Sequence, residues 1–254
     1  MSDVTIVTPL TVSLVAAVSF FNAAYNAAVG PTGGAMITGF AASLPPQLAL
    51  LLHAIGNIIG ATTRSLTYRR YLRLYPSLVL LGGIALGLGT GAYLFQFVPE
   101  VALQLAIGTA MLLLTWLPKP EAKGAPSLWR LGLASFFAAA VNLYVATAVL
   151  MAAYCERYFD GQAEGRKLML AHVNLWSLIQ NGLKIVFFTT FMVIDQHATL
   201  VLTGVVLGSM MVGHFVGLAV ADRVSERILK FLLKALITFS ALALLYKAAE
   251  TLMA

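Results

Sequence analysis

The chain has 254 residues, of which 60% are hydrophobic and only 10% charged, and its mean hydropathy is +0.88. Soluble domains contain about 25% charged residues, so this composition excludes an ordinary soluble domain and indicates an integral membrane protein. The single cysteine, Cys155, excludes an intramolecular disulfide and a multi-cysteine metal site. The formal net charge of +6 is better explained by basic cytoplasmic loops than by nucleic acid, so we expect no nucleic-acid partner.

Apolar segments follow one another along the whole chain, at about 9–29, 33–43, 47–63, 77–97, 101–117, 128–153, 168–194, 199–220 and 228–249. The separators 64–76, 118–130 and 222–230 carry several lysines and arginines, whereas 97–100 and 194–198 carry none. Because basic loops stay on the cytoplasmic side, the first three separators are expected inside and the other two outside. The sequence thus predicts a multi-pass protein of the plasma (inner) membrane in contact with the lipid bilayer.

Residues 128–167 must leave and return to the same face in this topology. Two full crossings need about 40 helical residues, but the apolar part offers only about 26. A re-entrant hairpin of two half-helices therefore fits better than two spans. The alternative is one ordinary span at 128–150 with an external loop, which places 222–230 outside, against the charge bias.

Residues 9–43 show the same feature more openly, because Pro31 and three glycines interrupt the apolar run at Gly30–Gly34. Proline removes a backbone donor and glycine loosens the backbone, so a helix should break there. A hairpin that starts outside, or a single span that starts in the cytoplasm, would satisfy the topology. The break favours the hairpin, and the lack of Lys or Arg before residue 9 agrees with an outside start.

An internal repeat links these two segments. Ser19–Asn26 matches Ser135–Asn142 at six of eight positions, and weaker matches follow in the same order, among them Gly83 and Gly87 with Gly204 and Gly208. We therefore expect an all-α integral membrane protein with two inverted repeats, at about 8–117 and 128–250. Each would be a broken, re-entrant helical hairpin followed by three transmembrane helices, and residues 1–254 would form a single transmembrane transporter domain.

The hairpin tips are the first candidate site, because such repeats bind substrate near the midplane between broken helices. Backbone N–H groups at Thr32, Gly33 and Gly34 would open the second arm and favour an anion, although glycines there could merely permit close packing. Gly83, Gly87, Gly91, Gly204 and Gly208 recur at four-residue spacing, for which packing is the better interpretation.

Polar side chains on the hairpin approaches could donate hydrogen bonds to a bound oxyanion: Asn22, Asn26, Asn142 and Tyr144. The asparagines could equally cap freed carbonyls, and the tyrosine could be an interfacial residue. The later spans add a second polar group: His53, Asn57, His172, Asn174 and Lys184.

Ionisable groups inside a membrane are costly and functional by default, so Lys184 could attract an anion and a histidine could exchange protons. Lys184 lies toward the end of its span, so its ammonium could instead snorkel to the membrane interface. A histidine bonded to a backbone carbonyl is an equally good interpretation. No span shows paired carboxylates or an HExxH motif, so we expect no catalytic residue, no cofactor and no metal ligand.

The quoted residues resemble a known family. GPTGGAM at 30–36, LPPQLALLLHAIGNIIG at 44–60, Tyr68-Arg69-Arg70, a glycine-stepped span and Pro99-Glu100 are similar to the sulfite exporter TauE/SafE family. The resemblance implies export of sulfite, sulfonates or related anions, with protons as a candidate coupling ion. Its first-half glycine cluster corresponds to Gly30, Gly33 and Gly34, but 143–147 reads Leu-Tyr-Val-Ala-Thr where a second cluster is expected.

The sequence therefore predicts a secondary transporter that moves a small sulfur-containing anion by alternating access around a midplane site. A passive anion channel on the same scaffold is the alternative. An intramembrane enzyme is less favoured, because no span combines a nucleophile with a base. Whether the chain forms a homo-oligomer is open.

Overall fold

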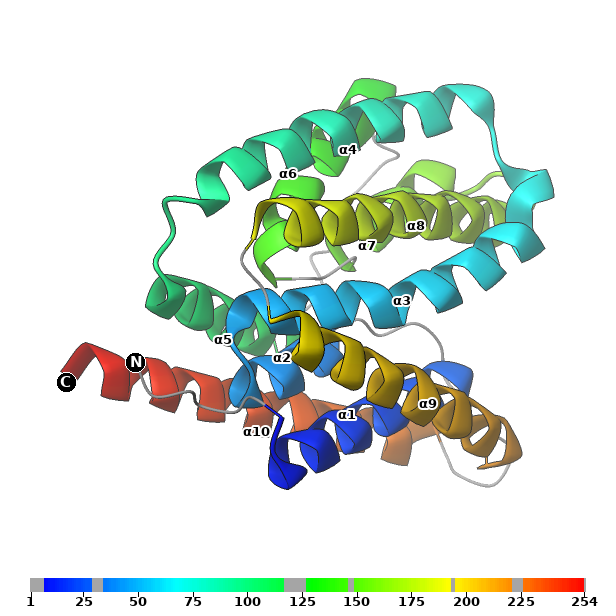
Figure 1. Cartoon of the computed structure of the whole chain (residues 1–254). Helices are drawn as coiled ribbons and strands as arrows, with labels where there is room; N and C mark the ends of the chain where they lie inside the picture. The colour runs from blue at the N-terminus through cyan, green and yellow to red at the C-terminus, as the bar shows by residue number, and fades with distance from the viewer. Residues whose placement is uncertain are drawn as a thin grey trace. The chain divides into compact units, whose positions relative to one another are not determined.

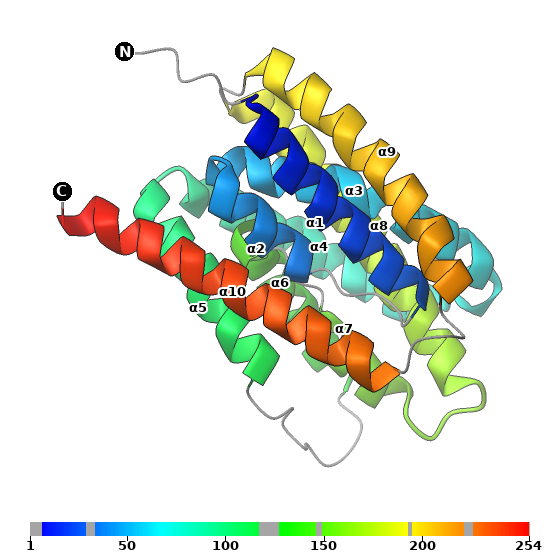
Figure 2. The ribbon, with the colours of Figure 1, turned by 90° about the horizontal axis from the view of Figure 1, so that it is seen from below.

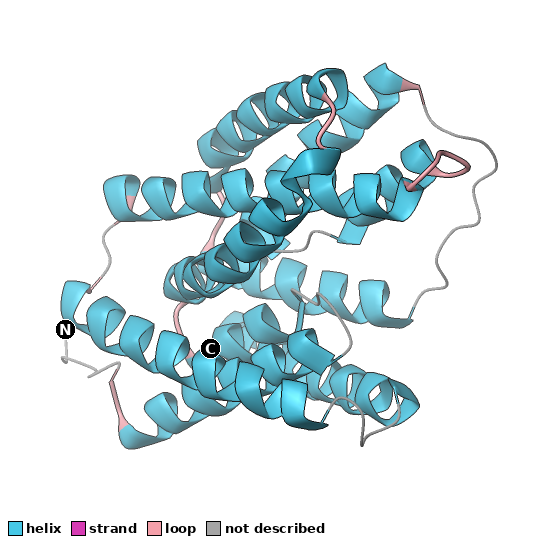
Figure 3. Ribbon diagram, turned by 90° about the vertical axis from the view of Figure 1, so that its right-hand side faces the viewer, coloured by secondary structure: helices cyan, strands magenta, loops and turns pink. Residues whose placement is uncertain are grey.

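The computed structural model describes residues 7–28, 34–116, 127–145, 149–192, 195–220 and 226–253, and these ranges contain helices but no strand (Figures 1 and 3). The helices are α1 Pro9–Ala28, α2 Gly34–Ser43, α3 Pro46–Tyr68, the short 3₁₀ helix η1 Arg69–Tyr71, α4 Leu74–Phe95, α5 Glu100–Trp116, α6 Leu128–Val145, α7 Val149–Phe159, α8 Gly165–Phe191, α9 Gln196–Val220 and α10 Glu226–Met253.

Three stretches of the described helices are long and apolar enough to cross a membrane: Pro9–Ala27, Leu74–Phe95 and Gln196–Ala219. Many of their large apolar side chains are exposed, for example Leu200 and Phe215 on α9, as expected of surfaces that face lipid. The expectation of an all-α membrane protein is thereby confirmed.

The described helices end and begin beside the two breaks that the sequence predicts. Helix α1 ends at Ala28 and α2 begins at Gly34, while α6 ends at Val145 and α7 begins at Val149. Residues 29–33 and 146–148, and with them Thr32 and Gly33, lie outside the described residues.

The arms of each hairpin are unequal, which differs from the expected pair of half-helices. Helix α1 has 20 residues and α6 has 18, whereas α2 and α7 have 10 and 11. At 1.5 Å per residue α1 is about 30 Å long, the thickness of a bilayer core. The helical length of the second hairpin, estimated from its apolar residues, was too short because α7 continues through the charged residues Glu156 and Arg157.

The chain divides into two compact units, and each draws helices from both halves of the sequence. Unit 1 comprises 1–56, 99–117 and 191–254, which hold α1, α2, the first part of α3, α5, α9 and α10. Unit 2 comprises 57–98 and 118–190, which hold the rest of α3, η1, α4, α6, α7 and nearly all of α8.

In unit 1, α1 and α9 lie side by side and run in the same direction (Figures 1 and 2). A Cβ atom on Gly213 would overlap the carbonyl oxygen of Phe20, and one on Gly217 would overlap that of Ala24. Both glycines are therefore needed for the two backbones to approach this closely. Helices α1 and α9 thus start at the same end of the unit, which agrees with the expectation that both start outside.

Helices α5 and α10 of unit 1 run in opposite directions. Trp116 Nε1 donates to Thr238 Oγ1 over 2.9 Å at one end, and Gly108 faces Leu245 further along. The Lys234 ammonium also lies 5.1 Å from the centre of the Trp116 ring. The end of α5 and the start of α10 therefore share one end of the unit, as expected for helices flanked by basic separators.

In unit 2, glycines of α4 likewise allow α4 and α6 to pack closely. A Cβ on Gly83 would crowd Ser135, one on Gly87 would overlap the Phe136 carbonyl, and one on Gly91 would lie 3.0 Å from the Ala140 oxygen. Because the contacts advance together along both helices, α4 and α6 run in the same direction. The packing interpretation of Gly83, Gly87 and Gly91 is confirmed.

The glycine contacts also change how the repeat is aligned. Phe20 and Ala24 on α1 face Gly213 and Gly217, while Phe136 and Ala140 on α6 face Gly87 and Gly91. Gly87 and Gly213 are 126 residues apart, and so are Gly91 and Gly217. Glu100 and Glu226 have the same separation. The sequence match instead paired Gly83 and Gly87 with Gly204 and Gly208, which lie 121 residues further along the chain. A Cβ atom on Gly204 or Gly208 would meet nothing within 4 Å, so the packing interpretation is wrong for these two glycines.

Candidate functional site

One face of α8 carries a buried stripe with a residue at every fourth position: His172, Trp176, Gln180, Lys184 and Phe188. Residues four apart share a face of a helix. Three of the side chains donate to α6, each about one turn further along. Trp176 Nε1 donates to Ser135 Oγ over 3.0 Å and Gln180 Nε2 to the Ala139 oxygen over 3.0 Å. Lys184 Nζ donates to the Asn142 oxygen over 2.6 Å.

Lys184 is the chemical centre of this stripe. Its side chain is fully buried, and among the described residues it is the only buried lysine, arginine or carboxylate. The ion pair between described residues joins Lys167 to Glu164, so no described carboxylate balances the Lys184 ammonium. An ammonium group has three N–H donors, and Asn142 accepts one of them.

The Asn142 carbonyl stands at the broken end of α6, which stops at Val145. The last four carbonyls of a helix lack an intrahelical partner and carry a partial negative charge. Lys184 therefore caps this helix end, and the cap explains part of its burial. It leaves a cation next to the gap in the second hairpin.

Three buried acceptor oxygens on α6 and α8, the helices that Lys184 joins, have no described partner. Gln180 Oε1, Asn181 Oδ1 and Asn142 Oδ1 are buried and have no hydrogen-bond partner among the described residues. The amide orientation of Gln180 is set by its bond to Ala139, and that of Asn181 by Nδ2 donating to the Ser177 oxygen over 2.7 Å. An unpaired buried polar atom costs about 1–3 kcal/mol, so a set of them calls for a partner.

An aromatic cluster lies one turn beyond Lys184. Tyr144 stacks on Phe95 with ring centres 5.5 Å apart, and Phe188 meets Phe95 edge-on at the same distance. The Tyr144 hydroxyl donates to the Gly91 oxygen over 2.9 Å. That bond uses the hydroxyl proton that could otherwise be donated to an oxyanion, and Tyr144 packs here between α6 and α4.

His172 occupies the first position of the stripe, three turns from Lys184. Its Nδ1 lies 2.8 Å from the Leu168 oxygen, and the Arg73 backbone N–H donates to its Nε2 over 3.2 Å. The ring also packs on Phe159, 4.7 Å between centres. Both nitrogens thus bond to main chain, and His172 joins α8 to the start of α4.

The connection near His172 carries further polar contacts. Arg73 Nη1 donates to Gln162 Oε1 over 2.7 Å, so the separator 64–76 meets a second separator, the mixed-charge residues 155–167, at one end of unit 2. Beside them, a hydrogen bond from the Lys167 ammonium lowers the pKa of the Glu164 carboxyl. This arrangement agrees with a shared cytoplasmic face for both separators.

Asn174 is occupied by structural bonds as well. Arg64 Nε donates to Asn174 Oδ1 over 2.9 Å, and Asn174 Nδ2 donates to the Leu170 oxygen over 2.7 Å. Asn57, on the same helix as Arg64, is half-buried. Among the sequence-predicted site residues of unit 2, the structure therefore brings Asn142 and Lys184 together and gives Asn174 another role.

Unit 1 holds the remaining predicted residues. Asn22 is buried on α1, where its Nδ2 lies 3.5 Å from Met36 Sδ of α2 and its Oδ1 has no described partner. Asn26 is half-buried in the last turn of α1, Gly34 is the first residue of α2, and His53 is buried on α3. The first hairpin therefore also pairs a broken helix with a buried amide.

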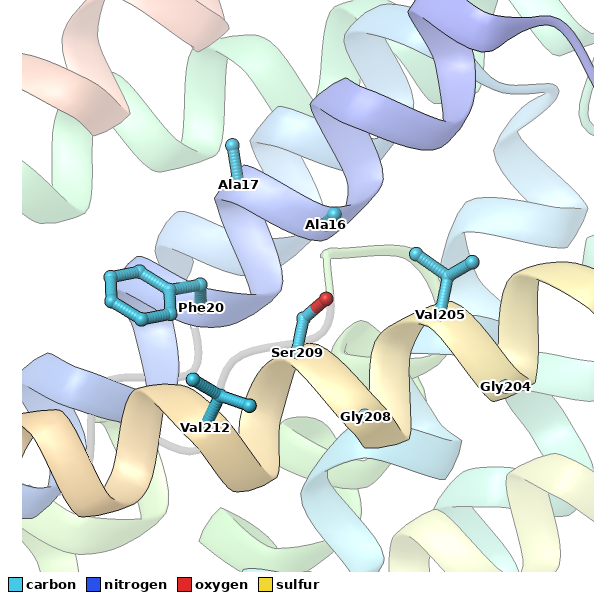
Figure 4. A pocket seen from close by; sticks show the side chains of 8 residues that line it. All are labelled: Ala16, Ala17, Phe20, Gly204, Val205, Gly208, Ser209 and Val212. Atoms are coloured by element: carbon cyan, nitrogen blue, oxygen red, sulfur yellow. The ribbon is translucent and has the colours of Figure 1, made fainter.

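A groove of about 550 Å³ lies between α1 and α9 in the same unit (Figure 4). Its lining is apolar apart from one hydroxyl and comprises Ala16, Ala17, Phe20, Gly204, Val205, Gly208, Ser209 and Val212. A small anion would find almost no hydrogen-bond donor there. The polar cluster around Lys184 is therefore the better candidate site.

Gln180 and Asn181 are visible in the sequence as polar residues of the same span as Lys184, but sequence reasoning gave them no role in the site. It also gave no role to Ser135 and Trp176, whose hydrogen bond joins α6 to α8. The regular four-residue spacing from His172 to Phe188 was visible in the sequence and could have identified the stripe. Which helix the stripe faces could not be read from spacing, because that depends on the pairing of α8 with α6.

Apolar helices long enough to cross a bilayer, interrupted hairpins and a buried lysine at a helix break define an integral membrane protein with a polar site inside it. The chain belongs to the sulfite exporter TauE/SafE family, whose model matches residues 15–244. This is a family of membrane transporters for sulfite or related anions, and the resemblance found in the sequence is confirmed. No curated protein and no solved structure matches the chain.

Proposed function

We propose that this chain is a secondary transporter of the plasma (inner) membrane that exports a small sulfur-containing anion, such as sulfite or an organosulfonate. The anion binds beside Lys184, at the broken end of α6. The observation that carries the proposal is the complete burial of Lys184 without a described carboxylate partner.

A charged lysine buried inside a membrane protein is costly, and an uncharged residue could fill the same volume. The cap on Asn142 engages one of three donors, so it offsets this cost only in part. An oxyanion would accept the remaining N–H groups and cancel the charge.

Alternating access and proton coupling belong to this proposal. Movement of the hairpins would expose the site to each side in turn, as in other transporters with broken helices. Both His172 nitrogens bond to main chain, so a proton would be carried by His53 or by the substrate itself.

Radiolabelled sulfite uptake into proteoliposomes tests the proposal, with sulfonates, carboxylates and neutral analogues as competitors. We expect saturable uptake that sulfonates inhibit and neutral analogues do not. Loss of a hydrogen bond to a charged group costs about 1.5–3 kcal/mol, so Lys184→Gln should lower uptake roughly tenfold or more.

Lys167→Gln is the matched control, because it removes an exposed ammonium from the same helix and should leave uptake unchanged. Equal inhibition by anions and neutral analogues, or full uptake by Lys184→Gln, would contradict the proposal.

A further inference from the structure

We infer that the anion bound beside Lys184 carries a hydrogen-bond donor of its own, a hydroxyl or protonated oxygen, next to its anionic group. The inference rests on the proposed function and makes its substrate class narrower. It comes from the acceptor atoms of the site, which the anionic group alone would leave unpaired.

The acceptors are fixed by their own contacts. The Gln180 amide nitrogen is bound to the Ala139 oxygen, and the Asn181 amide nitrogen to Ser177, so turning either amide would bring two oxygens together. Gln180 Oε1 and Asn181 Oδ1 therefore present lone pairs, not N–H groups. Asn142 Oδ1 is a third buried acceptor without a described partner.

The acceptor of Gln180 belongs to a side chain one helical turn from the cation. Gln180 and Lys184 are one turn apart on the same face of α8, and they bond to Ala139 and Asn142, which are three residues apart on α6. Three residues span about 4.5 Å along a helix axis. A ligand of a few heavy atoms can therefore reach the Lys184 ammonium with one end and the Gln180 oxygen with the other.

A fully ionised oxyanion without a donor matches only half of this site. It accepts from Lys184, but its lone pairs face the lone pairs of the amide oxygens. Sites with buried polar groups reject ligands that leave those groups unpaired, because the desolvation cost is not recovered. A ligand with both an anionic group and an O–H group satisfies the cation and the acceptors together.

Three sulfonates of similar size separate these possibilities as competitors of labelled sulfite uptake. Ethanesulfonate has no donor, 2-methoxyethanesulfonate has an extra oxygen but no donor, and 2-hydroxyethanesulfonate has an O–H group. We expect the hydroxyl compound to inhibit at about tenfold lower concentration than the other two, the effect of one unpaired buried group.

Two variants test whether the Gln180 oxygen causes the preference for the hydroxyl compound. Gln180→Met removes the acceptor and should reduce the preference for the hydroxyl compound to less than about threefold, since one of the buried acceptors is gone. Trp176→Phe also removes a hydrogen bond from α8 to α6 but no unpaired acceptor, so it should keep the full preference. Asn181→Leu provides a second acceptor deletion if Gln180→Met does not fold.

The outcomes distinguish this inference from the proposed function. Equal inhibition by all three sulfonates overturns the inference and leaves anion transport intact, with bound water as the partner of the amide oxygens. A preference that survives both acceptor deletions also overturns it. Absence of saturable sulfite uptake, with no inhibition by any sulfonate, overturns the proposed function itself.

Discussion

At the scale of single residues, Ser135 joins three helices. Its Oγ donates to the Leu80 oxygen over 2.8 Å and accepts from Trp176 Nε1 over 3.0 Å. Ser135→Ala should lower the stability by about 1–3 kcal/mol, because it leaves the Trp176 N–H buried and unpaired. Thermal unfolding in detergent measures the effect. Trp176→Phe in the same background should add little, whereas additive losses would show that the two side chains are not coupled.

Residues of this kind mark the limit of sequence reasoning. Lys184 and Asn142 could be selected because polar side chains are rare in apolar segments and costly in a membrane. Tyr144 and His172 were selected for the same reason, but their partners are main-chain groups of Gly91, Leu168 and Arg73. Only the three-dimensional pairing of helices distinguishes the two cases.

At the scale of elements, glycines set the distance between paired helices. Gly213→Ala and Gly217→Ala place a Cβ against the α1 backbone, and overpacking of this kind costs about 1–3 kcal/mol. Gly204→Ala and Gly208→Ala on the same helix meet nothing within 4 Å and serve as matched controls. We expect a lower thermal unfolding midpoint for the first pair only; equal effects from all four would contradict the assigned contact face.

The breaks between helices were predictable, but the lengths of the arms were not. Pro31 and its glycine neighbours cannot continue a helix, so the end of α1 followed from local chemistry. The second break has no such signal, and only the repeat at Ser135–Asn142 placed it. The charged end of α7 was assigned to a loop, because hydropathy alone does not show that a helix leaves the apolar region.

At the scale of the whole molecule, the direction of the helices in unit 2 predicts which ends share a face. Arg70 and Ala163 lie near the linked Arg73–Gln162 end, while Phe97 follows the opposite end of α4. Cysteines placed at 70 and 163 should react with a membrane-impermeant thiol reagent only after the membrane is opened. A cysteine at 97 should react from outside.

The buried Cys155 should contribute little background to this labelling. Strong external labelling at 163 would overturn the cytoplasmic placement of the segment before α8, and with it the hairpin assignment of residues 128–167.

The central claim is that an anion crosses the membrane by occupying a saturable site at Lys184. Counterflow in proteoliposomes tests it most directly: vesicles preloaded with unlabelled sulfite take up a trace of radiolabelled sulfite from outside. The account predicts transient accumulation of label above equilibrium by the wild type and by Lys167→Gln, and none by Lys184→Gln. Label that only equilibrates in the wild type would indicate a passive channel, and full counterflow by Lys184→Gln would remove Lys184 from the site.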